Sequence, residues 1–288
     1  MSFSTTELEP ATPLRFVVFG DGGSGLPAQK RIAEQLARYH QQHPFHLVLL
    51  LGDNIYPNGD ALKYGESRFT ALYQPLLEQQ VIFKPVLGNH DISGPLGVGY
   101  PAFWMSNRRE NMRFFNMPDT YYDFIFGPFH FFMLDTNRFR QTQRKWLNTA
   151  FAKSDDSAIK IVCGHHPVMS SGFHGSTPRL KRHLKPMLEK HGAAFYLSAH
   201  EHDYERFEPV NEVTYIVSGG GGADLREFRK KAEPASLIRA SRHHFMAFEY
   251  FENCLSAQVI DDTGNVLDQF SINLPLAVAQ PHPHLQIH

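Results

Sequence analysis

The sequence predicts an α/β protein whose functional residues lie at the carboxyl ends of its strands. Short apolar runs of strand length are separated by segments in which apolar residues recur at helical spacing. Several runs stop at a glycine followed by a polar residue, as the run 47–51 stops at Gly52 and Asp53. An apolar fraction of 42% in 288 residues is enough for a sizeable core, and a single domain is favoured.

The first part of the chain is expected to alternate strands with helices. A β-branched and aromatic run ends in a Gly-Asp-Gly-Gly turn, and apolar residues then recur at helical spacing before the next strand. Strand, helix and strand in this order make a βαβ unit, which places two strand ends side by side. The expected elements are strands at 14–19, 47–51 and 81–87 and helices at 28–39 and 66–79.

The second part resumes this alternation after an irregular stretch. The segment 92–118 is rich in Gly, Pro, aromatic residues and Arg, and we expect a long ordered loop over one face. A hairpin is expected around Gly127 and Pro128. The further expected elements are strands at 121–126, 129–134, 159–163, 194–198, 215–217 and within 244–273, and helices at 141–152 and 178–191.

Composition and charge restrict the partners of the chain. Lys and Arg total 28 against 29 for Asp and Glu, so the net charge of -1 predicts no nucleic-acid or membrane surface. The start lacks the basic and apolar segments of a signal peptide, and no apolar run approaches the roughly 18 residues that span a bilayer. We expect a cytoplasmic protein, extracytoplasmic only if an export signal is missing from this chain. The expected organisation is a polar leader at 1–13, one domain at 14–274 and a flexible tail at 275–288.

Five strand ends each deliver a side chain that can bind a metal ion. A single Asp in a turn, or a single loop His, usually has no such role, but five such endings in sequence order indicate a metal site. Carboxylates, an amide, imidazoles and a phenol, with no thiolate, suit iron, manganese or zinc and argue against a structural zinc cluster. The side chains are Asp21, Asp53 with Tyr56, Asn89, His165, and His200 with His202.

Asp53 and Tyr56 give the strongest indication of how many metal ions the site holds and of which metal it contains. The Asp53 carboxylate has two oxygens, so it can bridge two metal ions, which few other side chains can do. The phenol of Tyr56, three residues further on, becomes a ligand only to a strongly acidic ion. The pair therefore points to a site that contains iron(III).

The five strand endings resemble the five signatures of the binuclear metallophosphoesterases, the calcineurin-like superfamily. They are Gly20-Asp21-x-Gly23, Gly52-Asp53-x-x-Tyr56, Gly88-Asn89-His90-Asp91, Val162-x-x-His165 and x-His200-x-His202. Because of Tyr56, the chain resembles the small, single-domain purple acid phosphatases within that superfamily. The resemblance runs from about Leu14 to Ser218. It implies the metallophosphoesterase fold, a four-layer α/β/β/α sandwich of two mixed β-sheets flanked by helices.

The resemblance also implies which residues bind which ion. Iron(III) would be held by Asp21, Asp53, Tyr56 and His202. A second, divalent ion, Fe, Zn or Mn, would be held by Asp53, Asn89, His165 and His200. Asp53 belongs to both sets and would bridge the two ions.

The expected function is metal-dependent hydrolysis of phosphomonoesters, with a small phosphorylated molecule as substrate. Two cations about 3.5 to 4 Å apart lower the pKa of bound water and hold the attacking and leaving oxygens, so a metal-bound hydroxide would attack phosphorus in line. By the resemblance, His90 contacts the phosphate, and His174, nine residues past His165, is the general acid for the leaving alkoxide.

Two alternative functions compete with this interpretation. The first is a phosphodiesterase, for cyclic nucleotides or phospholipid headgroups, on the same scaffold; Tyr56 and His174 favour the monoesterase. The second is a scaffold protein without catalysis. Such a protein is expected to lose metal ligands, whereas every candidate position in this chain is filled.

Several residues near the motifs receive structural interpretations. The two cysteines are expected to be buried free thiols. The glycines at 219–222 lack the Lys-Ser/Thr of a phosphate-binding loop, so close backbone packing beside the metal site explains them better. His166 could also point into the site, but its position directly after His165 favours a role in orienting the ligand or in the structure. Glu205 and Arg206 are read either as orienting neighbours or as a solvated pair.

Overall fold

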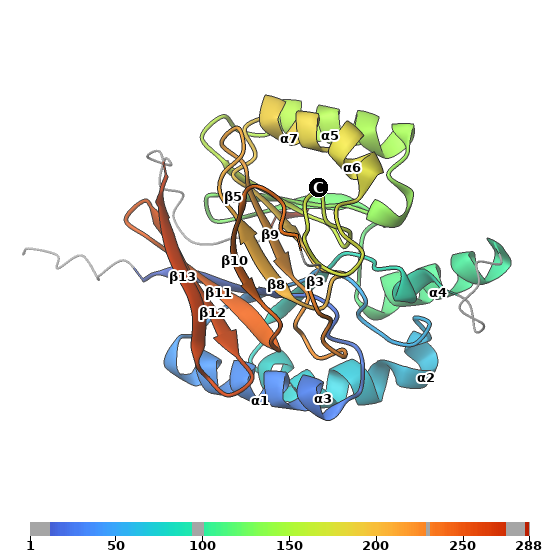
Figure 1. The fold of residues 1–288 in the computed structure, drawn as a ribbon. Coiled ribbons are helices and arrows are strands. Elements are labelled where there is room, and N and C mark those ends of the chain that lie inside the picture. The colour runs from blue at the N-terminus through green and yellow to red at the C-terminus, as the bar shows by residue number, and fades with distance from the viewer. Residues whose placement is uncertain (1–11, 94–100, 229–230, 275–285, 288) are drawn as a thin grey trace, which may run out of the picture.

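The computed structural model describes residues 12–93, 101–228, 231–274 and 286–287. Two β-sheets lie face to face with helices on both outer sides (Figure 1), which confirms the predicted four-layer α/β/β/α sandwich with two mixed sheets. Residues 1–11, 275–285 and 288 lie outside the described residues. The division into leader, domain and tail therefore stays a prediction.

The six-stranded sheet combines the first three strands of the chain with three late ones. In sheet order its strands are β13 (Val266–Asn273), β12 (Cys254–Asp261), β11 (His244–Phe251), β1 (Leu14–Phe19), β2 (Leu47–Leu50) and β3 (Ile82–Pro85). Strands β1, β2 and β3 are parallel, whereas β11 pairs antiparallel with β1. All of β2 is buried, because both faces of this parallel strand are covered.

The eight-stranded sheet carries the second group of motifs. In sheet order its strands are β10 (Ser236–Ala240), β8 (Tyr204–Phe207), β9 (Thr214–Ser218), β7 (Phe195–Ser198), β6 (Ile159–Cys163), β5 (Phe129–Met133), β4 (Tyr122–Phe126) and β14 (Gln286–Ile287). The central strands β5, β6, β7 and β9 are parallel. The carboxyl ends of β6 and β7 therefore lie side by side at one edge.

Helices cover the outer face of each sheet (Figure 1). On the side of the six-stranded sheet lie α1 (Pro27–Gln42), α2 (Ala61–Gly65), the π-helical turn η1 (Glu66–Thr70) and α3 (Ala71–Leu77). On the side of the eight-stranded sheet lie α5 (Gln141–Lys153), α6 (Pro178–His183) and α7 (Lys185–Lys190). Short 3-10 turns, η2 (His90–Ile92) and η3 (Thr136–Arg138), follow β3 and β5.

The prediction of a long loop at 92–118 is wrong, because α4 (Pro101–Phe114) fills the middle of this segment. Polar side chains hold the helix in place. Asn107 Nδ2 donates to the carbonyls of Asn58 and Ser93, and Asn111 Nδ2 donates to those of Gly59 and Asp91. This helix is anchored by amide hydrogen bonds and lacks a strong apolar stripe, so hydrophobic periodicity does not reveal it.

Two predicted helices are divided in the structure. The expected helix at 178–191 separates into α6 and α7 around Leu184, next to Pro186, which lacks the N–H of a helix interior. The expected helix at 66–79 begins earlier, at Ala61, and passes through the π-helical turn η1. Both segments are helical, as predicted, but neither forms one continuous α-helix.

Two hydrophobic cores hold the layers together. The larger core fills the space between the sheets with buried side chains such as Phe16, Leu49, Phe131 and Phe195. The smaller one, with Leu147 among its members, packs the eight-stranded sheet against its helices. Both cysteines are free thiols, as predicted; Cys163 is fully buried in the larger core, and Cys254 is half-buried. Burial raises the pKa of the Cys163 thiol far above its usual range, so it is not positioned as a thiolate ligand.

The two sheets are also joined by a polar contact at their edge. Arg206 on β8 donates from Nε and Nη2 to the two carboxylate oxygens of Asp268 on β13, at 2.6 and 3.1 Å. Tyr204 donates its hydroxyl to the same carboxylate at 2.6 Å. Arg206 is therefore neither an orienting neighbour of the metal ligands nor half of a solvated pair with Glu205. The prediction for Arg206 is wrong because sequence proximity does not show which strand it faces.

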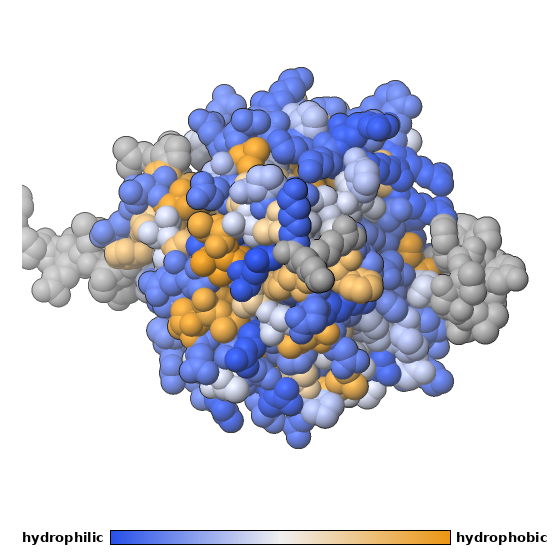
Figure 2. Space-filling model, in the orientation of Figure 1, coloured by the Kyte–Doolittle hydropathy of each residue, from blue (hydrophilic) through white to orange (hydrophobic). Residues whose placement is uncertain are grey.

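The surface is predominantly hydrophilic, with apolar patches around the strands at the left of the view in Figure 2. Leu237 of β10 and Val266 of β13 are among the exposed large apolar side chains, at 46% and 51%. Among the described residues, no helix is long and apolar enough to cross a membrane.

Candidate metal centre

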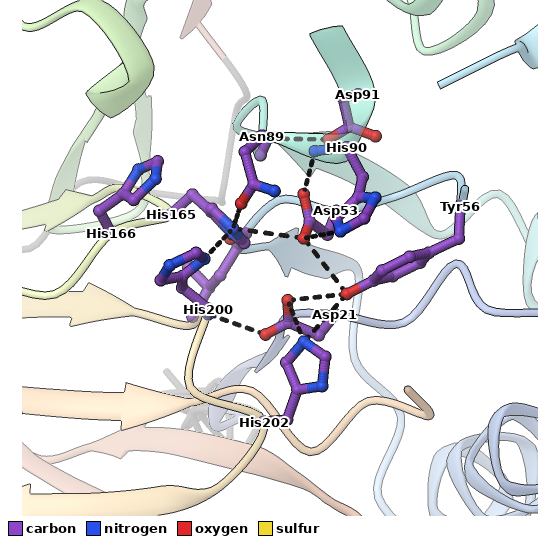
Figure 3. A network of polar contacts seen from close by, with 12 residues as sticks. Asp21, Asp53, Tyr56, Asn89, His90, Asp91, His165, His166, His200 and His202 are labelled. Atoms are coloured by element: carbon purple, nitrogen blue, oxygen red, sulfur yellow. Dashed lines mark hydrogen bonds and ion pairs between the residues drawn. The ribbon is translucent and has the colours of Figure 1, made fainter. Parts of the chain in front are cut away.

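The predicted ligands follow the carboxyl ends of β1, β2 and β3 in one sheet and of β6 and β7 in the other, and Figure 3 shows them close together. Four of them have a positive φ that non-glycine residues adopt at a steric cost: Asp21 (56°), Asp53 (53°), His200 (76°) and His202 (53°). Strain repeated at four positions of one edge is a common property of functional sites.

One group of side chains gathers around the hydroxyl of Tyr56. The Tyr56 hydroxyl lies 3.2 Å from Asp21 Oδ1, 3.2 Å from Asp53 Oδ2 and 3.1 Å from His202 Nε2 (Figure 3). A phenol has one proton to donate, so it cannot satisfy three neighbouring acceptors. The three contacts therefore leave an excess of lone pairs around this position.

A second group gathers around Nε2 of His165. This atom lies 3.0 Å from Asn89 Oδ1, 3.1 Å from His200 Nδ1 and 3.4 Å from Asp53 Oδ2. Asp53 Oδ2 thus belongs to both groups. The other ring nitrogen, Nδ1, donates to the Leu51 carbonyl at 2.9 Å, so a neutral His165 turns a lone pair toward the group.

The chemistry of these groups fits metal ions. His202 resembles His165, because its Nδ1 donates to the Asp224 carbonyl at 2.7 Å and its Nε2 faces Tyr56 and, at 3.5 Å, Asp21 Oδ1. In their neutral forms these two imidazoles turn lone pairs toward carboxylate, amide and phenol oxygens, so the contacts lack protons for hydrogen bonds. A cation in each group converts these repulsive contacts into ligand bonds.

The pKa values show how strongly the site attracts positive charge. For His165, burial lowers the pKa, but Asp53 and Asp21 outweigh it and raise the pKa to about 9. For Asp53, burial raises the pKa, but His165 and His90 hold it well below its usual range. Burial, opposed by His165 and reinforced by Asp53, raises the pKa of Asp21 to about 8. Without a metal, protons occupy the place that a cation would take.

Asp91 supports the site and was not singled out from the sequence. Its carboxylate is fully buried and accepts hydrogen bonds from the backbone N–H groups of Asn54, Ile55 and Gly88, at 2.9, 3.1 and 2.8 Å. It also accepts from Asn54 Nδ2 at 2.8 Å. Asp91 therefore fixes the turn that carries Asp53 against the turn that carries Asn89. Its place in the Gly-Asn-His-Asp motif was the signal available in the sequence.

His90 and His174 lie at the border of the ligand groups. His90 Nδ1 donates to the Pro57 carbonyl at 2.6 Å, and its Nε2 lies 3.9 Å from Asp53 Oδ2. The His174 ring stacks on the His200 ring, with centroids 4.3 Å apart, and is 38% exposed. Both histidines are thus placed to reach a molecule bound between the ligands and solvent.

Two buried carboxylates hold the loop that carries His174. Glu201 Oε2 accepts from the backbone N–H of His174 at 2.8 Å. Glu205 Oε2 accepts from the backbone N–H of Ser171, at 2.6 Å. Glu205 therefore holds the loop that carries His174, and it is buried rather than part of a solvated pair. Glu201 was not predicted, because its contact depends on the fold of a loop far from it in sequence.

His166 lies beside His165 and His200, and one ring nitrogen of each of these three histidines comes within 4.8 Å of the other two. Its backbone N–H and its Nδ1 both contact Thr136 Oγ1, at 3.0 and 2.8 Å. Its ring also lies against that of His200, with centroids 4.6 Å apart. Burial, and then the neighbouring His165, lower the pKa of His166 to about 3, so the ring is a neutral neighbour of the site.

The glycine-rich segment at 219–222 packs closely beside the ligands, as predicted. A Cβ on Gly219 would lie 2.6 Å from Asp21 Oδ2, so no larger residue fits there without displacing the carboxylate. The segment is tied to β11, because the N–H of His244 donates to the Gly220 carbonyl at 2.9 Å. His244 is fully buried, donates from Nδ1 to the Arg242 carbonyl at 2.8 Å and lies 3.0 Å from Ser218 Oγ.

This buried histidine predicts a loss of stability in acid. Burial lowers the pKa of His244 from 6.5 to about 4, so between these values the unfolded chain binds a proton that the folded chain does not. Its contribution is fully present above pH 6.5 and is lost as the pH falls to about 4. A shift of this size is worth about 3 kcal/mol of unfolding free energy. Urea denaturation of wild type and His244→Gln, at pH 7 and at pH 4.5, measures it.

The glutamine amide can donate to Arg242 and accept from Ser218 without titrating, which makes His244→Gln a matched control. Other titrating groups are common to both proteins and cancel in the difference. We expect wild type to lose about 2 kcal/mol more than the variant between pH 7 and pH 4.5, because the full difference is reached only below pH 4. If both proteins lost the same unfolding free energy, His244 would not be a source of the acid sensitivity.

Comparisons with known proteins place the chain among hydrolases. Residues 14–204 match the family described as calcineurin-like phosphoesterase. The chain is 30% identical over 286 residues to tartrate-resistant acid phosphatase type 5 of Oryctolagus cuniculus, covering 85% of each protein. It is 26% identical to purple acid phosphatase 4 of Arabidopsis thaliana, covering 91% of this chain and 84% of that protein.

Solved structures show the same fold. A purple acid phosphatase from yellow lupin (Lupinus luteus) seeds aligns with a TM-score of 0.78 and 21% identity, covering 92% of this chain and 54% of that one. A protein described as the anchor in the inner membrane complex of Plasmodium aligns with the same TM-score and 19% identity, covering 93% and 91%. At such identities the likeness shows the fold alone, and function depends on the site.

The family match and the relatives define a metal-dependent phosphoester hydrolase. The chain belongs to the calcineurin-like phosphoesterase family, and its relatives within that family are the tartrate-resistant and purple acid phosphatases. It is therefore a phosphoric ester hydrolase of the acid phosphatase type, as the five motifs predicted.

Proposed function

We propose that the protein hydrolyses small phosphomonoesters with a binuclear centre of iron(III) and a divalent ion, Fe, Zn or Mn. The observation that carries this proposal is the Tyr56 hydroxyl, within 3.2 Å of Asp21, Asp53 and His202. Burial and the two carboxylates raise the pKa of Tyr56 well above its usual range, so only a strongly acidic cation displaces the phenol proton. Among the metals that suit these ligands, iron(III) is the most acidic.

Each of the two ligand groups binds one ion in this proposal. In this proposal the group around Tyr56, with Asp21, Asp53 and His202, holds iron(III). The group around His165, with Asp53, Asn89 and His200, holds the divalent ion. The position of Asp53 Oδ2 supports a bridging role, because it lies 3.2 Å from the Tyr56 hydroxyl and 3.4 Å from His165 Nε2.

The surrounding residues position and protonate the substrate. When bound, two such ions activate water and neutralise the charge of the phosphoryl oxygens. His90 is oriented by the Pro57 carbonyl, which leaves its Nε2 free to contact a phosphate oxygen. His174 is the proposed general acid for the leaving alcohol, and Glu201 Oε2 lies 3.6 Å from its Nδ1.

Metal analysis, a visible absorption spectrum and phosphatase assays on the purified protein test this proposal together. A coloured solution with about two metal ions per chain, active on p-nitrophenyl phosphate, is the expected result. A colourless protein with two zinc or manganese ions that prefers bis(p-nitrophenyl) phosphate would instead favour a phosphodiesterase. A protein without metal or activity would point to a scaffold.

Replacing Tyr56 by phenylalanine is expected to remove the visible colour and leave the fold and part of the activity intact. The colour would come from charge transfer between the phenolate and iron(III), and phenylalanine has no oxygen to bind the ion. Phenylalanine keeps the ring that packs against His90, with 4.3 Å between the ring centroids. The measurement is the visible spectrum beside the iron content, with Tyr73→Phe, a buried tyrosine of α3, as the control. An unchanged band in the Tyr56 variant would disprove the iron–phenolate assignment.

A further inference from the structure

Arg226 lies beside the proposed general acid and has no role in the function described so far. It follows the glycine-rich segment, and its Nη1 donates to the His200 carbonyl at 2.8 Å and lies 3.1 Å from His174 Nδ1. One guanidinium nitrogen thus contacts both the loop of a proposed ligand and the residue that would face the leaving group.

The backbone holds Arg226 in this position. Its N–H donates to the His202 carbonyl at 3.4 Å, and Ser241 Oγ donates to its carbonyl at 3.0 Å. Two residues earlier, the Asp224 carbonyl accepts from His202 Nδ1 at 2.7 Å. The segment is therefore attached to the loop of the metal ligands at two points, so the cation is part of the rim of the site.

The guanidinium has donors that no described residue uses. Four arginines of the chain, at positions 15, 31, 108 and 206, each pair with a carboxylate within 4.0 Å. Arg226 has no such partner among the described residues, and its Nε and Nη2 make no hydrogen bond with any of them. The side chain is only half-buried, so these N–H groups can meet a molecule from solvent.

Charge and position together suggest what that molecule carries. A guanidinium with free N–H groups matches the planar, bidentate geometry of a carboxylate or a phosphate. If His174 protonates the ester oxygen, the part of the substrate beyond that oxygen is the part that reaches Arg226. The neighbouring Phe173 is 61% exposed and carries no charge, so Arg226 supplies the polar contact on this side.

We propose that Arg226 is a specificity residue that binds a second anionic group of the substrate, on the leaving-group side of His174. The preferred substrates are then phosphomonoesters whose alcohol carries a carboxylate or a further phosphate close to the ester oxygen. This inference rests on the proposed phosphomonoesterase function and names the substrate class of that site.

Three small esters test it: ethyl phosphate, 2-phosphoglycolate and ethane-1,2-diol bisphosphate. The last two add a carboxylate or a phosphate to the same two-carbon frame. The quantity to compare is the ratio of kcat/KM for each anionic ester to kcat/KM for ethyl phosphate. Using this ratio removes any general effect of the substitution on His174.

Arg226→Met keeps much of the length of the side chain and removes its charge. We expect this ratio of kcat/KM values to fall about 10- to 100-fold, which corresponds to the loss of one charge-assisted hydrogen bond. Arg226→Lys keeps a point charge and should keep part of the preference. Arg239→Met, which removes a cation that lies over Phe228, is the control and should leave the ratio unchanged. The wild-type preference should weaken as salt is added.

Each outcome decides between alternatives. A fall for the carboxylate ester only, or for the bisphosphate only, supports the site and identifies its anion. An equal loss on all three esters would overturn the proposal, because Arg226 would then act only through His174. No change in any ratio would overturn it as well. Wild-type protein that hydrolyses none of the three would reject the proposed function itself, and the anion site with it.

Discussion

Alanine in place of Asp53 is expected to abolish metal binding in both ligand groups and to reduce phosphatase activity by more than a thousandfold. One electrostatic contact to a transition state is worth roughly 100- to 1,000-fold, and this variant removes a contact shared by two ions. Asp53 Oδ2 lies 3.2 Å from the Tyr56 hydroxyl and 3.4 Å from His165 Nε2, so it is within reach of both groups. Metal content by elemental analysis and kcat/KM on p-nitrophenyl phosphate are the measurements.

The matched control for this variant is Asp123→Ala. Asp123 is also a buried carboxylate next to a histidine, with its Oδ2 2.8 Å from His130 Nε2, but it lies on β4, away from the ligand groups. We expect it to keep its metals and its activity even if it is less stable. If Asp53→Ala retained one full equivalent of metal, the two ions would not share this residue.

Asp91→Ala is expected to lower the free energy of unfolding by about 3 to 5 kcal/mol. Four N–H groups donate to the Asp91 carboxylate, and all of them would lose their acceptor in a buried environment. This loss corresponds to a fall in Tm on the order of 10 °C for a domain of this size. Urea and thermal unfolding of metal-free protein measure it without a contribution from lost metal.

Two further variants define the cause of this loss. Asp91→Asn keeps the shape of the side chain and one acceptor oxygen, so it should lose less than the alanine variant. Asp155→Ala removes an exposed carboxylate and should change stability by less than about 0.5 kcal/mol. A loss below 1 kcal/mol in Asp91→Ala would mean that water replaces the carboxylate, and that the two turns do not depend on it.

The ligands could be predicted because each one ends a strand. An apolar run that stops at a glycine and a polar residue has the same meaning in any parallel sheet, so Asp21, Asp53 and His165 could be placed before their partners were known. The order of the five motifs along the chain then predicted the fold. Their roles as ligands remain a proposal that metal analysis tests.

The supporting residues could not be predicted, because their partners are distant in sequence and lie on other elements. Arg226 meets His174 across 52 positions, and Asp91 meets Asn54 across 37. The helix α4 was missed for a related reason, since its amides bind carbonyl groups that only the folded chain brings near. Hydrophobic periodicity contains no information about such contacts.

The discontinuous six-stranded sheet has a consequence for the order of events during synthesis. The last proposed ligand is His202, but β1, which positions Asp21, pairs on one side with β11, at His244–Phe251. A chain leaving the ribosome thus presents every ligand before the strand that completes their support exists. We expect the nascent chain to bind metal weakly, and firm loading to follow release of the finished polypeptide.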